Sequence, residues 1–196
     1  MKAKTYSLKT FQQSSRVINL LKFLSISFLG SILLVVSSKV VIPLAVVDGT
    51  PAPMVAILLG AMLGRTYAVG SVIAFLAEGA FGLPVFIGTP EKGIGLVYMA
   101  GPTAGFLMGY LVAAFVVGTL ADRGWGKTLL QSAAMMLTGM FCIHFFGVTW
   151  LSYLLGFEKA FMIDLQHFTS DFLVKGGFGA DIIPLFQTSI QKFLKK

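Results

Sequence analysis

The stretch LLQSAAMMLTGMFCIHFFGVTWLSYLL, residues 129–155, decides the fold class. It contains no aspartate, glutamate, lysine or arginine. It is also longer than the roughly 20 predominantly apolar residues that a helix needs to cross the hydrocarbon core of a bilayer. The stretch therefore predicts a membrane-spanning helix, and the chain on either side of it contains further apolar segments.

The composition of the 196-residue chain excludes most other classes of protein. Hydrophobic residues make up 56% of it and charged residues only 12%, whereas an ordinary soluble domain carries about 25% charged residues. So few charges cannot cover the surface of a soluble enzyme of this size. The chain is too apolar to be disordered, and its single cysteine, Cys142, excludes a disulfide scaffold.

The chain contains six apolar segments, at about residues 18–47, 53–63, 67–81, 95–120, 129–155 and 168–186, with a loop rich in glycine and proline at 82–94. We therefore predict an all-α integral membrane protein with six transmembrane helices. These helices form one membrane domain, residues 18–190, between a basic N-terminal segment, 1–17, and a basic tail, 191–196. The weakest segment is 53–63, which is short for a crossing.

The distribution of charge predicts the orientation in the membrane. Fifteen lysines and arginines against eight acidic residues give a net charge of +7. In a soluble protein this balance would suggest a nucleic-acid partner, but here the positive-inside rule explains it, and we predict no nucleic-acid partner. With both termini cytoplasmic, the inner segments hold eleven of the fifteen cations, whereas the outer loops hold Asp48, Glu91, Glu158 and Asp164.

Signatures of catalysis are scarce. The sequence has neither the P-loop of ATP-hydrolysing proteins nor the HExxH zinc motif, and it lacks the GxSxG elbow of hydrolases. His144 and His167 have no plausible set of partners nearby in the sequence. We therefore predict that the chain is not an enzyme and that it uses no metal and no cofactor.

Four ionisable residues fall within or beside the apolar segments: Glu78, Asp171, Lys175 and Asp181. An ionisable group at membrane depth is costly and usually faces a cavity or a partner. Asp171 and Lys175 stand four residues apart and therefore share one face of a helix. They either neutralise each other or separate to contact a ligand that has hydrogen-bond donors and an anionic end. Glu78 and Asp181 can instead lie near a membrane surface.

Glycines recur every four residues at Gly101, Gly105 and Gly109, so they lie on one face of a helix. Such a face either packs closely against another helix or forms a smooth wall for a flat ligand. Phe86, in the preceding loop, is a candidate to flank that ligand.

Two motifs carry a resemblance to a known family. Gly79-Ala-Phe-Gly82-Leu-Pro-Val-Phe86, followed by Gly101-Pro-Thr-Ala-Gly-Phe106, resembles the BioY family, the biotin-binding S components of energy-coupling factor transporters. The resemblance extends from about residue 42 to residue 175. It implies a six-helix protein of the cytoplasmic (inner) membrane of a prokaryote that binds biotin from the outer side. It also implies a transmembrane coupling protein and two ATPase subunits as partners, besides membrane lipid.

The family's sixth helix usually carries an acid-and-lysine motif. His167-Phe-Thr-Ser-Asp171-Phe-Leu-Val-Lys175 looks like this motif, and Gly179-Ala-Asp181 is an alternative match for the acid. By resemblance, docking to the coupling module uses a small-residue face on the first helix, for which Ser27, Gly30 and Ser31 are the candidates.

The chemistry of biotin suggests a role for each candidate. Biotin has a ureido ring with two N–H donors, an apolar thioether ring and a carboxylate tail. A polar group left unmatched in a desolvated pocket costs roughly 1–3 kcal/mol. We therefore expect Asp171 to accept from the ureido group, Lys175 to meet the tail, Thr103 to donate, and Phe86 to form an apolar wall beside Gly101. The alternatives are an S component for another vitamin, of the riboflavin or thiamine class, and a non-transport membrane assembly subunit.

Overall fold

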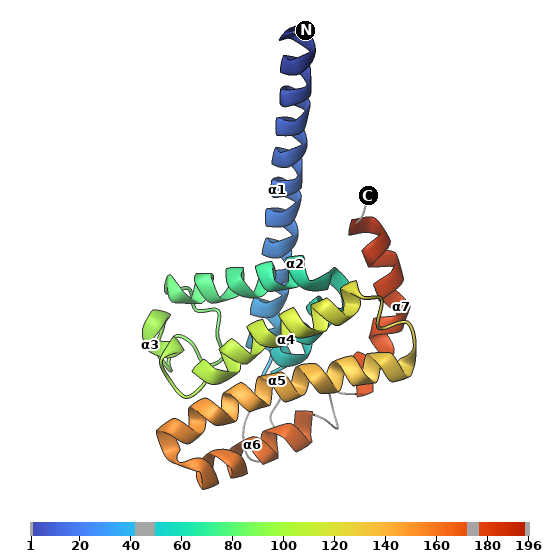
Figure 1. Cartoon of the computed structure of the whole chain (residues 1–196). Coiled ribbons are helices and arrows are strands. Elements are labelled where there is room, and N and C mark those ends of the chain that lie inside the picture. The colour runs from blue at the N-terminus through green and yellow to red at the C-terminus, as the bar shows by residue number, and fades with distance from the viewer. Residues whose placement is uncertain (1, 42–49, 172–176, 195–196) are drawn as a thin grey trace.

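The computed structural model describes the backbone of residues 2–41, 50–171 and 177–194, and the side chains of most of them. Within these ranges the chain is helical without a strand (Figure 1). The helices are α1 (Lys2–Lys39), α2 (Ala52–Ala80), α3 (Gly95–Met99), α4 (Ala104–Asp122), α5 (Leu129–Leu155), α6 (Phe157–Asp171) and α7 (Gly177–Leu194). The predicted all-α class is therefore confirmed.

In the part of the chain that the structure describes, four stretches of helix are long and apolar enough to cross a membrane: residues Arg16–Lys39 of α1, and the whole of α2, α4 and α5. The membrane class predicted from composition agrees with this. Helix α5 has the bounds expected from its uncharged sequence. The count of six transmembrane helices and the cytoplasmic position of both termini stay predictions.

The second and third predicted segments both lie in α2, which is kinked between them. Gly64 has φ 75° and ψ 176°, a conformation outside the helical region that glycine adopts at little steric cost. A β carbon at Gly64 would lie 2.2 Å from Oδ1 of Asp122, at the end of α4. The backbone N–H of Arg65 donates to the other oxygen of this carboxylate at 3.2 Å. The end of α4 thus caps the second half of α2 at the predicted break.

Three of the predicted segments are wrong in their bounds. Segment 18–47 lies in α1, which begins at Lys2 and ends at Lys39, and residues 42–49 lie outside the described residues. Segment 95–120 is divided, because Pro102 lies between α3 and α4 and a proline disfavours the helical conformation of the residue before it. Residues 157–167, expected as an outer loop, belong to helix α6, which packs on α5. The predicted segment 168–186 is shared between α6 and α7, and residues 172–176 lie outside the described residues.

The core of the bundle is formed by α2, α4 and α5, with α4 packed against both of the others. Figure 1 shows α4 and α5 running side by side, with α6 beyond α5. Helix α1 packs on α2 and meets its second half: Phe23 meets Tyr67, and Ser31 meets Glu78 further along both helices. The first part of α1 projects away from the bundle.

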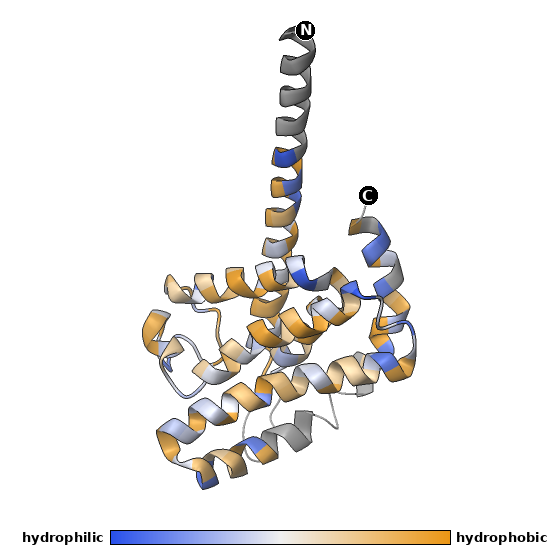
Figure 2. Cartoon of the chain, in the orientation of Figure 1, coloured by the Kyte–Doolittle hydropathy of each residue, from blue (hydrophilic) through white to orange (hydrophobic). Residues whose placement is uncertain are grey.

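The helices are hydrophobic over long stretches (Figure 2), and many of their large hydrophobic residues are exposed. Between Leu20 and Val36 of α1, every exposed residue except Ser25 is large and hydrophobic, namely Leu20, Leu21, Leu24, Phe28, Leu29, Ile32, Leu33 and Val36. A soluble monomer rarely exposes contiguous apolar surface of this extent. This surface suits contact with lipid or with another membrane protein.

Candidate functional site

The first sequence motif forms a tight turn at the end of α2. The N–H of Phe81 donates to the carbonyl of Ala77 at 2.9 Å, and the N–H of Leu83 donates to the carbonyl of Glu78 at 3.1 Å. These bonds end the helix and reverse the chain, so that Val85 returns to the core while Phe81 stays 89% exposed. The turn therefore delivers the following residue, Phe86, into the interior.

The ring of Phe86 is enclosed by aromatic residues and is only 2% exposed. It stacks on Tyr98 at 4.9 Å between ring centroids and meets Phe75 edge-on at 5.2 Å. It also lies against Gly79, where a β carbon would fall 2.0 Å from a ring carbon. Phe86 thus supports the loop from inside, and its predicted contact with a ligand stays a prediction.

Tyr98 joins the two sequence motifs. Its phenol donates to the carbonyl of Ile87 at 2.9 Å, and the N–H of Gly101 donates to the Tyr98 carbonyl at 3.0 Å. Burial raises the pKa of the Tyr98 phenol above its ordinary value, and a hydrogen bond with the Thr103 side chain opposes this rise. Phe86, Gly101 and Thr103, which the sequence selected, therefore all contact one residue: Phe86 and Thr103 meet the side chain of Tyr98, and Gly101 meets its backbone carbonyl.

Tyr98 was not among the candidates chosen from the sequence. The sequence offered one signal for it: Tyr98 carries both an aromatic ring and a hydroxyl group and lies three positions before Gly101-Pro-Thr.

A second tether holds the Gly101 segment. The indole N–H of Trp150, on α5, donates to the carbonyl of Gly101 at 2.9 Å. Trp150 is half-buried, and its ring lies 6.1 Å from that of Tyr153, which is exposed. Helix α5 therefore fixes the start of the second motif, a role that no local sequence pattern indicates.

The glycine repeat of α4 is used for helix packing at two of its three positions. A β carbon at Gly105 would lie 2.3 Å from the carbonyl oxygen of Phe146, and one at Gly109 would lie 2.7 Å from the Cα of Ile143. Both partners are on α5, so the packing interpretation is confirmed there. Gly101, which precedes α4, contacts the carbonyl of Tyr98 instead.

The four ionisable candidates do not form one cluster among the described residues. Glu78 is half-buried and accepts a hydrogen bond at 2.7 Å from the hydroxyl of Ser31 on α1. Asp181 is exposed on α7. Asp171 is the last residue of α6, and only its backbone is described. Lys175 lies outside the described residues. The predicted pairing of Asp171 with Lys175 stays a prediction.

The predicted coupling face of α1 is covered by α2. Ser27 and Ser31 are 4% and 0% exposed, and a β carbon at Gly30 would lie 2.1 Å from the hydroxyl oxygen of Ser71. The small side chains thus allow the two helices to approach closely. A partner cannot contact these three residues directly while α2 covers them.

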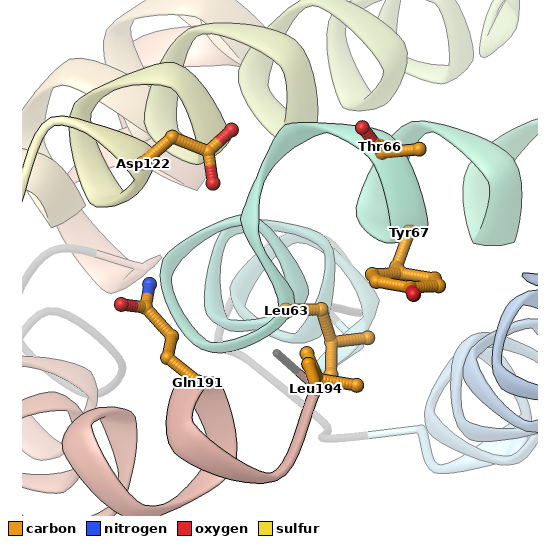
Figure 3. A pocket seen from close by; sticks show the side chains of 6 residues that line it. All are labelled: Leu63, Thr66, Tyr67, Asp122, Gln191 and Leu194. Carbon is orange, nitrogen blue, oxygen red and sulfur yellow. The ribbon is translucent and has the colours of Figure 1, made fainter. Parts of the chain in front are cut away.

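A cavity of about 300 Å³ lies at the opposite end of α4 from the two motifs (Figure 3). It is lined by the residues around the α2 kink and by the ends of α4 and α7, namely Leu63, Thr66, Tyr67, Asp122, Gln191 and Leu194. Among the described residues, none of those predicted to bind substrate lines it.

Comparison with known proteins places these features in a family. The sequence profile of the BioY family matches residues 9–192. The biotin transporter BioY of Rhizobium etli is 36% identical to this chain over 135 residues, 62% of this chain and 71% of that protein. The biotin transporter BioY of Thermotoga maritima is 33% identical over 144 residues, 73% of this chain and 82% of that protein.

The fold is also shared with a solved structure. The crystal structure of the S-component for biotin from an ECF-type ABC transporter matches with a TM-score of 0.64 and 23% identity, and the match covers 90% of this chain and 92% of that one. The two motifs meet around Tyr98 at one end of a helical bundle that has this fold. The family profile covers nearly the whole sequence, and the chain belongs to the BioY family.

Proposed function

We propose that this chain is the biotin-binding subunit of an energy-coupling factor transporter and mediates biotin uptake. The observation that carries the proposal is the meeting of the two motifs at Tyr98, in a chain whose relatives are named biotin transporters. Three predicted contact residues meet Tyr98, namely Phe86 and Thr103 at its side chain and Gly101 at its backbone carbonyl.

In this proposal, each polar or apolar part of biotin contacts a group of matching chemistry in the binding site. Thr103 and the N–H groups of the loop donate to the ureido carbonyl, and Phe86 with Gly101 supports the apolar wall. Asp171 accepts from the ureido N–H groups, and Lys175 neutralises the carboxylate tail. Glu78 and Asp181 are the secondary candidates for the acid.

The proposed energy source is a separate module. The sequence contains no P-loop, so in this proposal ATP is hydrolysed by other subunits. As the family resemblance implies, the proposed partners are a transmembrane coupling protein and two ATPase subunits. We propose a position in the cytoplasmic membrane of a prokaryote, with six transmembrane helices within residues 18–190 and both termini cytoplasmic. The basic segments 1–17 and 191–196 then lie on the side that the positive-inside rule requires.

Ser27, Gly30 and Ser31 enter coupling indirectly in this proposal. They hold α1 tightly on α2, and the apolar outer face of α1 stays available to the coupling protein or to lipid.

The test is direct binding of biotin to the purified protein in detergent, with riboflavin and thiamine as competing ligands. We expect saturable biotin binding that neither of the other vitamins displaces. Asp171→Ala and Lys175→Ala should each weaken binding by about tenfold or more, since each leaves one polar group of the ligand unmatched. Lys159→Ala, which removes an exposed cation from α6, is the matched control. Displacement of biotin by riboflavin or thiamine would favour another vitamin as the substrate, and unchanged binding in both site variants would exclude the assigned roles.

A further inference from the structure

The last turn of α1 is hydrogen-bonded to the loop that follows α2. The Lys39 ammonium donates to the carbonyl of Phe86 at 2.9 Å, to the carbonyl of Thr89 at 3.0 Å and to the Thr89 hydroxyl at 2.9 Å. A lysine ammonium has three donors, so these oxygens engage all of them. The hydroxyl of the neighbouring Ser38 contacts the carbonyl of Val85. Together these bonds form a clamp between α1 and residues 85–89.

The clamp acts on the residues that set the position of the Phe86 ring. The Phe86 carbonyl accepts from Lys39 and also from the Thr89 hydroxyl, at 2.7 Å. The loop's own backbone bonds are short-range turns: the N–H of Thr89 donates to Phe86 at 3.3 Å, and the N–H of Lys92 donates to Gly88 at 2.8 Å. Lys39 is thus a long-range tie that joins these turns to a membrane-spanning helix.

The positive charge of Lys39 is balanced here by neutral oxygens. Over the described residues, no carboxylate forms a salt bridge with Lys39. Within this part of the chain, carbonyl and hydroxyl oxygens hold the ammonium on the loop. A methionine at this position would keep a long side chain but remove every one of these bonds.

We propose that Lys39 is a positioning residue for the binding site: it holds residues 85–89 in the arrangement that a ligand meets, and so keeps the Phe86–Tyr98 pair in place. The ligand part of this inference rests on the proposed function, whereas the clamp itself does not. Loss of the clamp frees the loop and shortens the residence time of the bound ligand, with the rest of the bundle unchanged.

The experiment compares Lys39→Met with the wild type and with Lys39→Arg, which keeps a cationic donor. Lys159→Met, at an exposed lysine on α6, is the matched control. Hydrogen exchange is measured without ligand on peptides covering residues 84–93, and biotin dissociation is measured separately. In Lys39→Met we expect exchange in these peptides to be at least about tenfold faster, and biotin to dissociate about tenfold faster. Lys39→Arg should restore most of both, and Lys159→Met should resemble the wild type.

Unchanged exchange at residues 84–93 in Lys39→Met would overturn the clamp. Faster exchange spread equally over α2, α4 and α5 would also overturn it, because Lys39 would then support the whole bundle. If Lys39→Met does not fold, Ser38→Ala and Lys39→Arg provide the same local comparison. A wild-type protein that fails to bind biotin would instead refute the proposed function, and the exchange measurement would still decide the clamp.

Discussion

Removal of one partner from the buried pair of His144 and Asp164 should destabilise the protein far more than removal of both. Nδ1 of His144, on α5, lies 2.7 Å from Oδ1 of Asp164, on α6, and the two side chains are 10% and 9% exposed. Breaking a buried pair at one end costs about 3–5 kcal/mol, because the remaining polar group keeps its desolvation penalty and loses its partner. We therefore expect His144→Leu, which leaves the Asp164 carboxylate without this partner, to lower the free energy of unfolding by about 3 kcal/mol.

The double variant distinguishes this mechanism from a simple loss of packing. Leucine has the same branching as aspartate, so Asp164→Leu combined with His144→Leu replaces the pair by two apolar side chains. Such replacements are often neutral or stabilising, and we expect the double variant to lie within about 1 kcal/mol of the wild type. The two changes should thus be non-additive by at least about 2 kcal/mol, a coupling expected of residues in direct contact.

The assay is equilibrium unfolding in detergent micelles for the wild type, both single variants and the double variant. Met162→Leu, at an exposed position on α6, is the control and should change stability by less than about 0.5 kcal/mol. Exchange of the α6 amides then shows whether the loss is local to the α5–α6 contact. A double variant as unstable as the sum of the two single variants would refute the reasoning.

Four further predictions concern the kink and the motif region. Gly64→Ala should lower the free energy of unfolding by about 2–4 kcal/mol, since it combines a positive φ with a contact to Asp122. Gly82→Ala, with a positive φ but open space around it, should cost only about 1 kcal/mol in the same measurement. Trp150→Phe should weaken biotin binding about fivefold by removing the bond to Gly101, whereas Trp125→Phe should leave binding unchanged; equal effects of the two would contradict the tether. Because burial raises the pKa of Tyr98 in the folded chain, its stabilising contribution is present below pH of about 10 and is lost as pH rises further. Tyr98→Phe should therefore make the alkaline loss of stability less steep in unfolding titrations, and an identical slope would contradict this.

The parts of the fold that the sequence predicts are those set by local composition. Helix α5 follows from an uncharged run between polar loops, and the charge of Arg65 marks the break between the second and third predicted segments, where α2 is kinked at Gly64. Helix α6 was not predicted from the sequence. Three charged residues fall close together in this segment, Glu158, Lys159 and Asp164, and such a cluster is typical of a loop outside the membrane. Asp164 is tolerated in a packed helix because His144, twenty residues earlier, meets it, and a contact of this kind is not visible in a local pattern.

In the candidate site, too, local sequence predicts some residues, whereas contacts between distant parts of the chain determine others. The motifs identified Phe86, Gly101 and Thr103, but the side chains that hold them, Lys39 and Trp150, reach the site across long sequence separations. Their bonds depend on how α1 and α5 pack against the ends of α2 and α4. Helix packing of this kind follows from the whole bundle, so these two residues carry no signal in their own neighbourhoods.

The spacing of the first motif has a physical explanation in the structure. Gly79 lies in the last turn of α2, and Phe86 returns after the turn to place its ring where the β carbon of any other residue would be. The glycine and the aromatic ring are therefore two halves of one contact, separated by the length of chain that the reversal needs. Phe75 and Tyr98 enclose the remaining sides of the ring. The glycine and the phenylalanine of this motif therefore pack against each other inside the protein. Their packing holds the loop in place, and the position of the loop decides which of its polar groups can meet a ligand.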